Sequence, residues 1–524
     1  MTEKIIPLIY VLALGFVAYR LVNATFPEDQ QLGPRQIAFF IILNVTGFLI
    51  TALLPAPYAV FMIVTILSIL ILAPVEPVMR IAIFMFLCPL MPSLNYDLYM
   101  GVPLIWMNWP RVLIIVILMP MLVGAFRHKS PMHYPLDKFV WAYFLLCVVI
   151  AFRDTSFTNG LRGTTYLVID IVAPYFVFTR YLNSFADIRK VLFALLSSLV
   201  FAGLVNIFET ARTWLVFQQL TLNVNGVRFT SIQRLGLLRA TGPFDVPSRS
   251  AFALVTGIGL CWALAPYIKK RALLGAMVAI LAVGLFVTFS RGNWIGAAVI
   301  GSCYLLTVNR KKFLKYGATL AVCLTALSFT EAGKEVYSVL PFVGAEESEA
   351  AGTVGYRAIL LETSIRVAAE NPWFGSTTFH NHPDMNAIRQ SSGLLDLVNH
   401  YLIVVLNYGY VGLAAFVSIF ACVLLRLRRA LKKSRKISEH QRVFCRAIMF
   451  TIVGLLVAIT TTSAFGRVGL ILWALAAISA VATGLLLDKG RDSASVRTGH
   501  PASAFPRQAF GAPSTGGAPE HNRR

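Results

Sequence analysis

The sequence predicts an all-α, polytopic integral membrane protein, and three observations support this fold class. Hydrophobic residues make up 57% of the 524 residues and charged residues only 13%, whereas about a quarter of the residues in a soluble domain are charged. Apolar runs of about 18 residues or more, the length that a bilayer requires, recur along the chain. Short basic clusters separate many of these runs. We therefore expect about 14 transmembrane helices and one large external loop that carries short helices.

The predicted spans divide the chain into six segments. We expect transmembrane helices in residues 1–208, a loop at 209–249, transmembrane helices at 250–329, a large loop at 330–398, transmembrane helices at 399–487 and a disordered tail at 488–524. The individual spans are 5–22, 36–54, 57–74, 109–126, 138–152, 164–180, 189–208, 250–268, 272–289, 292–308, 313–329, 399–425, 443–464 and 468–487. A further run at 79–92 is short and contains two prolines, which favours a broken or re-entrant helix and leaves the number of spans at about 14 or 15.

Basic clusters predict the orientation of the spans, because cytoplasmic loops are enriched in Lys and Arg. The strongest cluster lies at 426–436, so this loop is expected in the cytoplasm. Counting the spans backwards puts the basic clusters at 309–312, 269–271 and 127–129 on the same side. The tail that follows the last span is then cytoplasmic as well. The two long loops fall on the opposite side of the membrane.

Arginine and lysine are distributed differently between the two sides. Among the residues that this topology places outside, Lys334 is the single lysine, whereas arginines are frequent. Arg291 is an example, because it stands at the outer edge between two spans. A guanidinium group binds phosphate or carboxylate through two parallel hydrogen bonds. Outside arginines therefore indicate an anionic ligand, although a general preference for Arg and attraction to lipid phosphates explain any single one about equally well.

Composition also bears on the partners and on the redox chemistry. The formal net charge is +22, which in a soluble protein would suggest nucleic acid. Here the charge is spread over many short loops, so membrane topology explains most of it, and we expect no nucleic-acid partner. The seven cysteines lie in apolar runs without a Cys-x-x-Cys motif. A disulfide framework or a zinc site is therefore not expected.

Both long loops contain candidate features. In the first, glycine and prolines interrupt regular structure just before the next span, which holds Arg239 and Arg249 near the membrane interface; a basic, lipid-facing loop is the alternative. In the second, residues 353–370 have near-helical apolar spacing and end before Pro372. They predict either an amphipathic helix on the outer leaflet or a packed cap over the bundle.

Histidines and one intramembrane acid are the other candidates. His380 and His382 form a His-x-His pattern, but no further ligand has convincing spacing, so we expect no metal. His400 stands at the outer start of a span, where a histidine moves a proton near neutral pH or serves as a structural hydrogen-bonding group. Asp170 lies inside a span, where a carboxylate is costly; pairing with an arginine or orienting a helix would explain it.

Four segments taken together resemble the superfamily of O-antigen ligases and O-antigen or exopolysaccharide polymerases, which are bacterial membrane glycosyltransferases. These segments are 239–244 (RATGPF), 290–292 (SRG), Tyr356-Arg357 with 371–375 (NPWFG), and 399–402 (NHYL) with 407–412 (NYGYVG). The resemblance covers roughly residues 200–425 in order and topology. One departure is that many relatives have a His before the Asn of the last motif, where this chain has Val398. This departure weighs most against ligase activity.

The resemblance implies glycosyl transfer at the periplasmic face of the bacterial inner membrane. The donor would be a glycan on undecaprenyl diphosphate, and the acceptor either another lipid-linked repeat unit, in a polymerase, or lipid A-core, in a ligase. Arg291, Arg239, Arg249 and Arg357 are the candidates for binding the diphosphate. His400 is the first candidate base and His380 the second. We expect no cofactor, because a lipid-linked donor needs neither a nucleotide-binding loop nor a metal.

Other classes of function remain open at this stage. A flippase or secondary transporter would show internal repeats and charged residues at the membrane midplane. No such repeat is obvious, and Asp170 is the one clear acid inside a span. The large external loop favours an enzyme over a transporter. A scaffold of an envelope assembly complex is the third alternative, which the sequence leaves open. For the enzyme, the expected partners are the lipid-linked glycan, membrane lipid and other polysaccharide export proteins.

Overall fold

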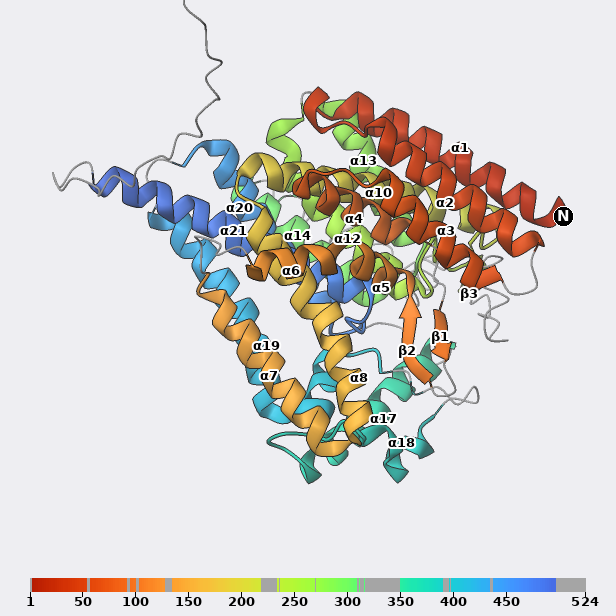
Figure 1. The fold of residues 1–524 in the computed structure, drawn as a ribbon, viewed down its shortest axis with the longest axis vertical. Coiled ribbons are helices and arrows are strands. Elements are labelled where there is room, and N and C mark those ends of the chain that lie inside the picture. The colour runs from red at the N-terminus through yellow and green to blue at the C-terminus, as the bar shows by residue number, and fades with distance from the viewer. Residues whose placement is uncertain are drawn as a thin grey trace, which may run out of the picture.

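The computed structural model (Figure 1) describes most of the chain and is almost entirely helical in that part. The described residues are 2–53, 57–91, 95–99, 103–127, 134–217, 233–234, 236–268, 270–308, 311, 315, 349–389, 395, 397–433 and 437–495. The predicted span 313–329, apart from Lys315, lies outside them. Of the tail predicted at 488–524, residues 488–495 continue helix α21, and residues 496–524 lie outside the described residues.

The first part of the chain forms helices and one hairpin. Its helices are α1 (Thr2–Thr25), the short η1 (Glu28–Gln30), α2 (Pro34–Leu53), α3 (Pro57–Leu72), α4 (Pro77–Leu90), α5 (Trp109–Leu113), α6 (Met119–Arg127), α7 (Leu136–Asp154), α8 (Phe157–Leu167), α9 (Ala173–Tyr181) and α10 (Phe185–Arg212). Two π-helical turns, η2 (Ile114–Leu118) and η3 (Val168–Val172), join α5 to α6 and α8 to α9. Strands β1 (Asn95–Tyr99) and β2 (Pro103–Asn108) pair antiparallel.

The second part begins with a two-residue ladder between β3 (Gln233–Arg234) and β4 (Leu237–Leu238). The helices that follow are α12 (Pro247–Leu264), η4 (Ala265–Tyr267), α13 (Arg271–Phe286), α14 (Arg291–Val308), α17 (Glu349–Glu370), η5 (Phe379–Asn381), α18 (Pro383–Ala387), α19 (His400–Lys433), α20 (Glu439–Ala458) and α21 (Arg467–Ser495). The backbone of α19 bends at Gly409, whose φ is +65°.

The helices confirm a multi-pass membrane protein. Among the described residues, nine helical segments are long and apolar enough to cross a bilayer, and three apolar helices are shorter. Two predicted spans, 138–152 and 292–308, correspond to helices α7 and α14, which are not among these segments. The number of about 14 spans therefore stays a prediction. The run predicted as broken forms one short uninterrupted helix, α4, because Pro89 falls in its last turn.

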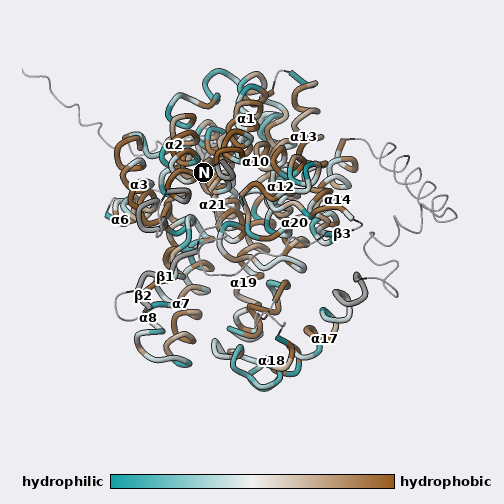
Figure 2. Tube along the Cα trace, turned by 90° about the vertical axis from the view of Figure 1, so that its right-hand side faces the viewer, coloured by the Kyte–Doolittle hydropathy of each residue, from teal (hydrophilic) through white to brown (hydrophobic). Residues whose placement is uncertain are grey.

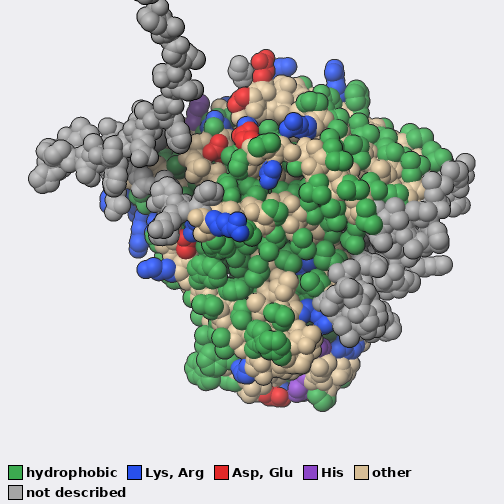
Figure 3. All heavy atoms as spheres, in the orientation of Figure 1, with side chains coloured by type: hydrophobic (Ala, Val, Ile, Leu, Met, Phe, Trp, Pro, Cys, Tyr) green, Lys and Arg blue, Asp and Glu red, His purple; other side chains and the backbone are tan. Residues whose placement is uncertain are grey.

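The helices pack into a broad body from which a narrower lobe projects. Figure 1 shows α7 and α19 running side by side from this body to α17 and α18 at the lower end. Hydrophobic residues predominate in the body, whereas the region of α18 is largely hydrophilic (Figure 2). Apolar side chains also cover much of the face in Figure 3. The exposed apolar residues of the protein include Ile63, Leu67 and Ile71 of α3. Such an apolar exterior suits contact with lipid.

The central helix of the body is α10, which packs against α4, α12 and α13. Small residues let α10 and α13 approach closely, since a Cβ atom added to Gly284 would lie 2.9 Å from the backbone of Gly203. A buried polar bridge lies beside this contact: the Asn206 amide donates to Ser250 Oγ at 2.9 Å and to the Gly284 carbonyl at 3.3 Å. Small residues and buried polar bridges are the usual means by which membrane helices associate.

This close contact makes Gly284 sensitive to substitution. In Gly284→Leu the new side chain must push α13 away from α10, and overpacking of this kind costs about 1–3 kcal/mol. We expect a lower midpoint of thermal unfolding for the purified protein in detergent micelles. Gly275→Leu is the matched control, because Gly275 lies in the same helix with no atom within 4 Å of its added Cβ. Equal midpoints for the two variants would contradict the proposed packing constraint.

Candidate functional site

Several loops that are far apart in the sequence meet at one end of the bundle. The backbone N–H of Ala240 donates to the Val287 carbonyl at 3.2 Å. The Arg467 guanidinium donates to the Pro243 carbonyl at 2.8 Å. The N–H of His400 donates to the Ile459 carbonyl at 3.0 Å. These bonds join the loop before α12, the turn before α14 and the connection between α20 and α21 to the start of α19.

A buried carboxylate holds the loop 239–244 in place. Glu209, in the last turn of α10, accepts hydrogen bonds from the backbone N–H groups of Thr241 at 2.9 Å, Gly242 at 2.8 Å and Val216 at 3.1 Å. Gly242 has a φ of +56°, a conformation that glycine adopts at little cost. Because a buried charge needs such partners, Glu209 and the loop fix each other. Sequence reasoning did not single out Glu209, although an acid at the end of an apolar run is a usable signal.

Two arginines of this loop are bound to the turn that precedes α14. Arg239 Nε donates to the Thr288 carbonyl at 3.1 Å. Arg234 Nη1 donates to the Phe289 carbonyl at 3.3 Å. Arg291, the first residue of α14, follows Phe289 by two positions. The backbone contacts therefore place the arginines of two separate loops next to one another.

Four arginines form a cluster at this point, which we call the arginine cluster: Arg234, Arg239, Arg291 and Arg357. Burial, followed by the positive charges of Arg234, Arg357 and Arg291, lowers the pKa of Arg239 to about 9. Burial, followed by the positive charge of Arg357, also lowers the pKa of Arg291. Like charges held together create a positive potential that attracts an anion. The structure thus brings together three of the four arginines predicted to bind diphosphate and adds Arg234.

The fourth predicted arginine, Arg249, has a different partner. It forms an ion pair with Asp245, four residues earlier in the chain and just before the start of α12. Near this pair lies Arg467, which is buried, donates to the Pro243 carbonyl and lies 5.1 Å from the ring centre of Phe244. Arg249 and Arg467 therefore stabilise the end of the loop that leads into α12. Sequence reasoning did not single out Arg467.

His400 is buried at the start of α19, and one of its two ring nitrogens makes a hydrogen bond to the protein backbone. Its Nδ1 atom accepts a hydrogen bond from the Ala464 N–H at 3.3 Å. The side chain of Asn399 caps the helix by accepting from the N–H of Tyr401 at 2.9 Å. In a neutral ring, an accepting Nδ1 leaves the proton on Nε2. The remaining ring nitrogen is therefore a hydrogen-bond donor in this arrangement.

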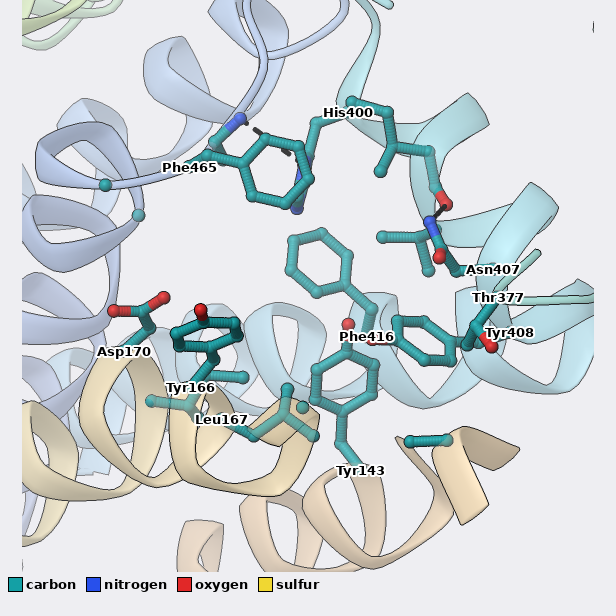
Figure 4. A pocket seen from close by; sticks show the side chains of 18 of the residues that line it. Tyr143, Tyr166, Leu167, Asp170, Thr377, His400, Asn407, Tyr408, Phe416 and Phe465 are labelled. Atoms are coloured by element: carbon teal, nitrogen blue, oxygen red, sulfur yellow. Dashed lines mark hydrogen bonds between the residues drawn. The ribbon is translucent and has the colours of Figure 1, made fainter. Parts of the chain in front are cut away.

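The ring of His400 lines a cavity of about 350 Å³, which we call the His400 cavity. Figure 4 shows His400 and Phe465 on one wall, with Asp170 and Tyr166 opposite. Of the two explanations considered for Asp170, the structure shows pairing with an arginine: Arg111 Nη2 lies 2.8 Å from its carboxylate. The other lining side chains are mainly aromatic or small and include Tyr143, Tyr408, Phe416, Trp473, Asn407 and Thr377.

Residues 459–467 connect the His400 cavity to the arginine cluster. Ile459 and Ala464 bind the backbone and the ring of His400. Between these two residues, Thr462 accepts a hydrogen bond through Oγ1 from the Asn293 amide of α14 at 3.0 Å. Gly292 approaches so closely that an added Cβ would overlap the side chain of Thr461. This segment therefore sets the position of Arg291 relative to His400.

The large loop contributes a second set of motif residues. The N–H groups of Tyr410 and Val411 donate to the carbonyls of Pro372 and Trp373 at 2.7 and 3.1 Å. An added Cβ on Gly375 would lie 2.6 Å from the backbone nitrogen of Gly409. The segments 371–375 and 407–412, which were grouped by resemblance, are thus in direct contact at the bend of α19.

Helix α17 ends at Glu370, as the sequence predicted, and begins at Glu349, earlier than predicted. It combines features of both expected alternatives. Val367 and Ala368 are buried in a small cluster with Leu406 of α19, as in a packed cap. Ile359 and Ile365 are exposed, as expected of a helix on a membrane surface.

His380, the second predicted base, does not line the His400 cavity. It is exposed on η5, and its carbonyl accepts from Arg389 at 2.7 Å. The ring of His382 accepts from the Asp384 N–H and lies 3.1 Å from Glu370. These contacts give His382 a structural role at the start of α18.

Comparison with known proteins agrees with the arrangement of these motifs. Residues 276–417 match the O-antigen ligase family. This segment belongs to the O-antigen ligase superfamily. The match covers about a quarter of the chain and includes Arg291, Arg357 and His400, whereas Arg239 and Arg249 precede it. The chain matches none of the curated proteins with which it was compared. The match of this segment supports glycosyl transfer of the ligase or polymerase type at the family level.

Proposed function

We propose that this protein polymerises the repeat units of a surface polysaccharide or exopolysaccharide. In this reaction a glycan is transferred from undecaprenyl diphosphate to a hydroxyl group of another lipid-linked repeat unit. The observation that carries the proposal is the arginine cluster, held by the 459–467 segment at the same end of the bundle as His400. The reaction would take place at the periplasmic face of the bacterial inner membrane, with the C-terminal tail in the cytoplasm.

The chemistry of the leaving group supports this assignment. Breaking the bond between sugar and phosphate leaves a diphosphate, whose charge must be stabilised as it develops. Guanidinium groups do this through paired hydrogen bonds. The mutual repulsion of Arg239, Arg291 and Arg357 is relieved when a diphosphate binds between them. A lipid-linked donor already carries its leaving group, so the proposed reaction uses no nucleotide, metal or other cofactor.

Ligation of a glycan to lipid A-core is the second candidate, because the family that matches residues 276–417 is named for O-antigen ligase. Polymerisation is preferred here because Val398 occupies the place of the His usually associated with ligases. Transport of a lipid-linked glycan is the third candidate, and the ion pair inside the bundle, Arg111 with Asp170, is the observation that favours it.

Deletion of the gene in its host tests these three functions together. For a polymerase we expect single lipid-linked repeat units to accumulate, measured by extraction of the lipid-linked pool and gel electrophoresis of the polysaccharide. Polymer that stays on its lipid carrier would indicate a ligase instead, and repeat units trapped on the cytoplasmic side a flippase. An unchanged pool would contradict all three. The wild-type gene on a plasmid must restore the parental pattern.

The role of Arg291 predicts a graded effect of substitution. Arg291→Ala removes a donor to the developing charge, so we expect polymer formation to fall roughly 100- to 1,000-fold. Arg291→Lys keeps the charge but not the bidentate geometry and should recover only part of this loss. Polymer length and amount on gels are the measurement, with membrane insertion checked by immunoblot.

Arg366→Ala is a suitable control for Arg291, because Arg366 is an exposed arginine of α17 paired with Glu362 and Asp384. It should leave the polymer unchanged. Polymer of normal length from a properly inserted Arg291→Ala protein would exclude Arg291 from the mechanism.

For His400, the hydrogen bond at Nδ1 predicts different effects for two amides. In His400→Gln the side-chain amide can take the place of the donating Nε2, whereas in His400→Asn it replaces Nδ1. If His400 acts as a donor, Gln should retain more polymerisation than Asn. Loss of about 100-fold or more in both variants would instead support the predicted base. Initial rates with purified protein in lipid vesicles make this comparison.

A further inference from the structure

The two side chains of the ion pair in the His400 cavity differ in exposure: Asp170 is partly exposed, whereas Arg111 is more deeply buried. Arg111 contacts both carboxylate oxygens of Asp170, through Nη2 at 2.8 Å and Nε at 3.3 Å. The Arg111 side chain is 10% exposed and that of Asp170 28%. A carboxylate has about four lone-pair positions, and the arginine occupies two of them. The remaining positions on Asp170 are available to accept hydrogen bonds within the cavity.

Neighbouring groups hold this pair in place. The Arg111 guanidinium lies 3.9 Å from the ring centre of Tyr166 and donates through Nη1 to the Trp106 carbonyl at 2.8 Å. The Tyr166 hydroxyl in turn accepts from the Trp106 N–H at 2.7 Å. Asp170 itself lies in the π-helical turn η3, and such turns are frequent at functional sites. The hairpin of β1 and β2 thus helps to fix the only lining carboxylate that the structure describes in this cavity.

The balance of charge in the cavity selects the class of ligand. The positive charge of Arg111 is matched by the negative charge of Asp170, and the other described lining residues are neutral or, in His400, hydrogen-bonded at Nδ1. A diphosphate gains little from a cavity without excess positive charge, and it has the arginine cluster nearby. A neutral molecule rich in hydroxyl groups suits the cavity, because it donates to Asp170 and accepts from His400 Nε2.

The walls of the cavity suit the apolar faces of such a molecule. Tyr143, Tyr408, Phe416 and Trp473 line it together with the small residues Gly466 and Gly469. Rings with a polar tip provide both an apolar surface and hydrogen bonds. A volume of about 350 Å³ is at the lower end of the range for small-ligand pockets, roughly 300–1,000 Å³. One sugar ring with its neighbouring linkage is of the appropriate size.

We propose that the His400 cavity binds the terminal sugar of the acceptor, and that Asp170 is a specificity residue that accepts hydrogen bonds from its hydroxyl groups. Arg111 is a positioning residue that orients the Asp170 carboxylate. This inference rests on the proposed glycosyl transfer and deepens it, because it separates a site for the neutral acceptor sugar from the site for the donor diphosphate.

Binding of two probes to the purified, full-length protein in lipid nanodiscs tests this assignment. The first probe is the free repeat-unit oligosaccharide, released from the polysaccharide of the host, and the second is inorganic pyrophosphate. Saturation-transfer NMR gives the dissociation constant of the oligosaccharide, and calorimetry that of pyrophosphate. We expect Asp170→Asn to weaken oligosaccharide binding roughly 10- to 100-fold, as for loss of hydrogen bonds to a charged group, and to leave pyrophosphate binding unchanged. Arg291→Ala should show the opposite pattern.

A second ion pair of the protein provides the matched control. Arg180 Nη2 lies 2.7 Å from Asp137, and the two side chains are 11% and 12% exposed, but neither lines the His400 cavity. Asp137→Asn should therefore bind both probes like the wild-type protein. The double variants Arg111→Met with Asp170→Leu and Arg180→Met with Asp137→Leu address misfolding, because replacing both members of a buried pair is often neutral for stability. Only the first double variant should lose oligosaccharide binding.

Three results would overturn the proposal: normal oligosaccharide binding by Asp170→Asn, weaker pyrophosphate binding in that variant, or no oligosaccharide binding by the wild-type protein. The gene deletion separates this proposal from the proposed function. If lipid-linked repeats accumulate on deletion while Asp170→Asn binds the oligosaccharide normally, the function stands and the acceptor site is wrong. If the lipid-linked pool is unchanged, the proposed function fails whatever the binding data show.

Discussion

The described site depends on the hydrogen bonds made by residues 459–467. This segment binds His400 at two points, through the Ile459 carbonyl and the Ala464 N–H, and it binds α14 through Thr462. Arg467 at its end reaches the Pro243 carbonyl of the loop that carries Arg239. A short connection between two membrane helices thereby fixes the relative positions of groups that are far apart in the sequence; we call these connected groups the frame of the site. Chemistry that needs reacting groups in fixed geometry gains most from such a frame.

Charge is distributed unevenly within this frame. The arginine cluster concentrates positive charge, whereas Arg111 and Asp170 cancel each other in the His400 cavity. A substrate with a charged end and a neutral end is oriented by this difference alone, since the wrong orientation would bury a diphosphate without excess positive charge around it. The proposed polymerase needs this discrimination because its donor and its acceptor carry the same chemical groups. The two sites would distinguish them by which end enters.

Sequence patterns predicted the helical membrane fold and much of the arginine cluster, for physical reasons. Long apolar runs have few alternatives to a membrane helix. Arg239, Arg291 and Arg357 were singled out among the arginines of a lysine-poor side because they stand in the segments that resemble the O-antigen ligase superfamily. The role of Glu209, the pairing of Arg249 with Asp245 and the partner of Asp170 depend on which helices are neighbours. That information lies in tertiary packing. The hairpin of β1 and β2 went unpredicted because it occupies an irregular connection without strong periodicity.

The turn before α14 shows how this site is kept rigid. Phe289 has a φ of +49°, a left-handed conformation in which glycine would be less strained. Its ring instead packs near Phe286 and Trp294, with ring centres 6.0 and 6.4 Å apart. Aromatic packing therefore offsets a local backbone cost of roughly 1–3 kcal/mol. Phe289 itself is buried, whereas Phe286 is exposed. The carbonyl groups that bind Arg234 and Arg239 are consequently held in position by aromatic rings that pack from the interior to the surface of the bundle.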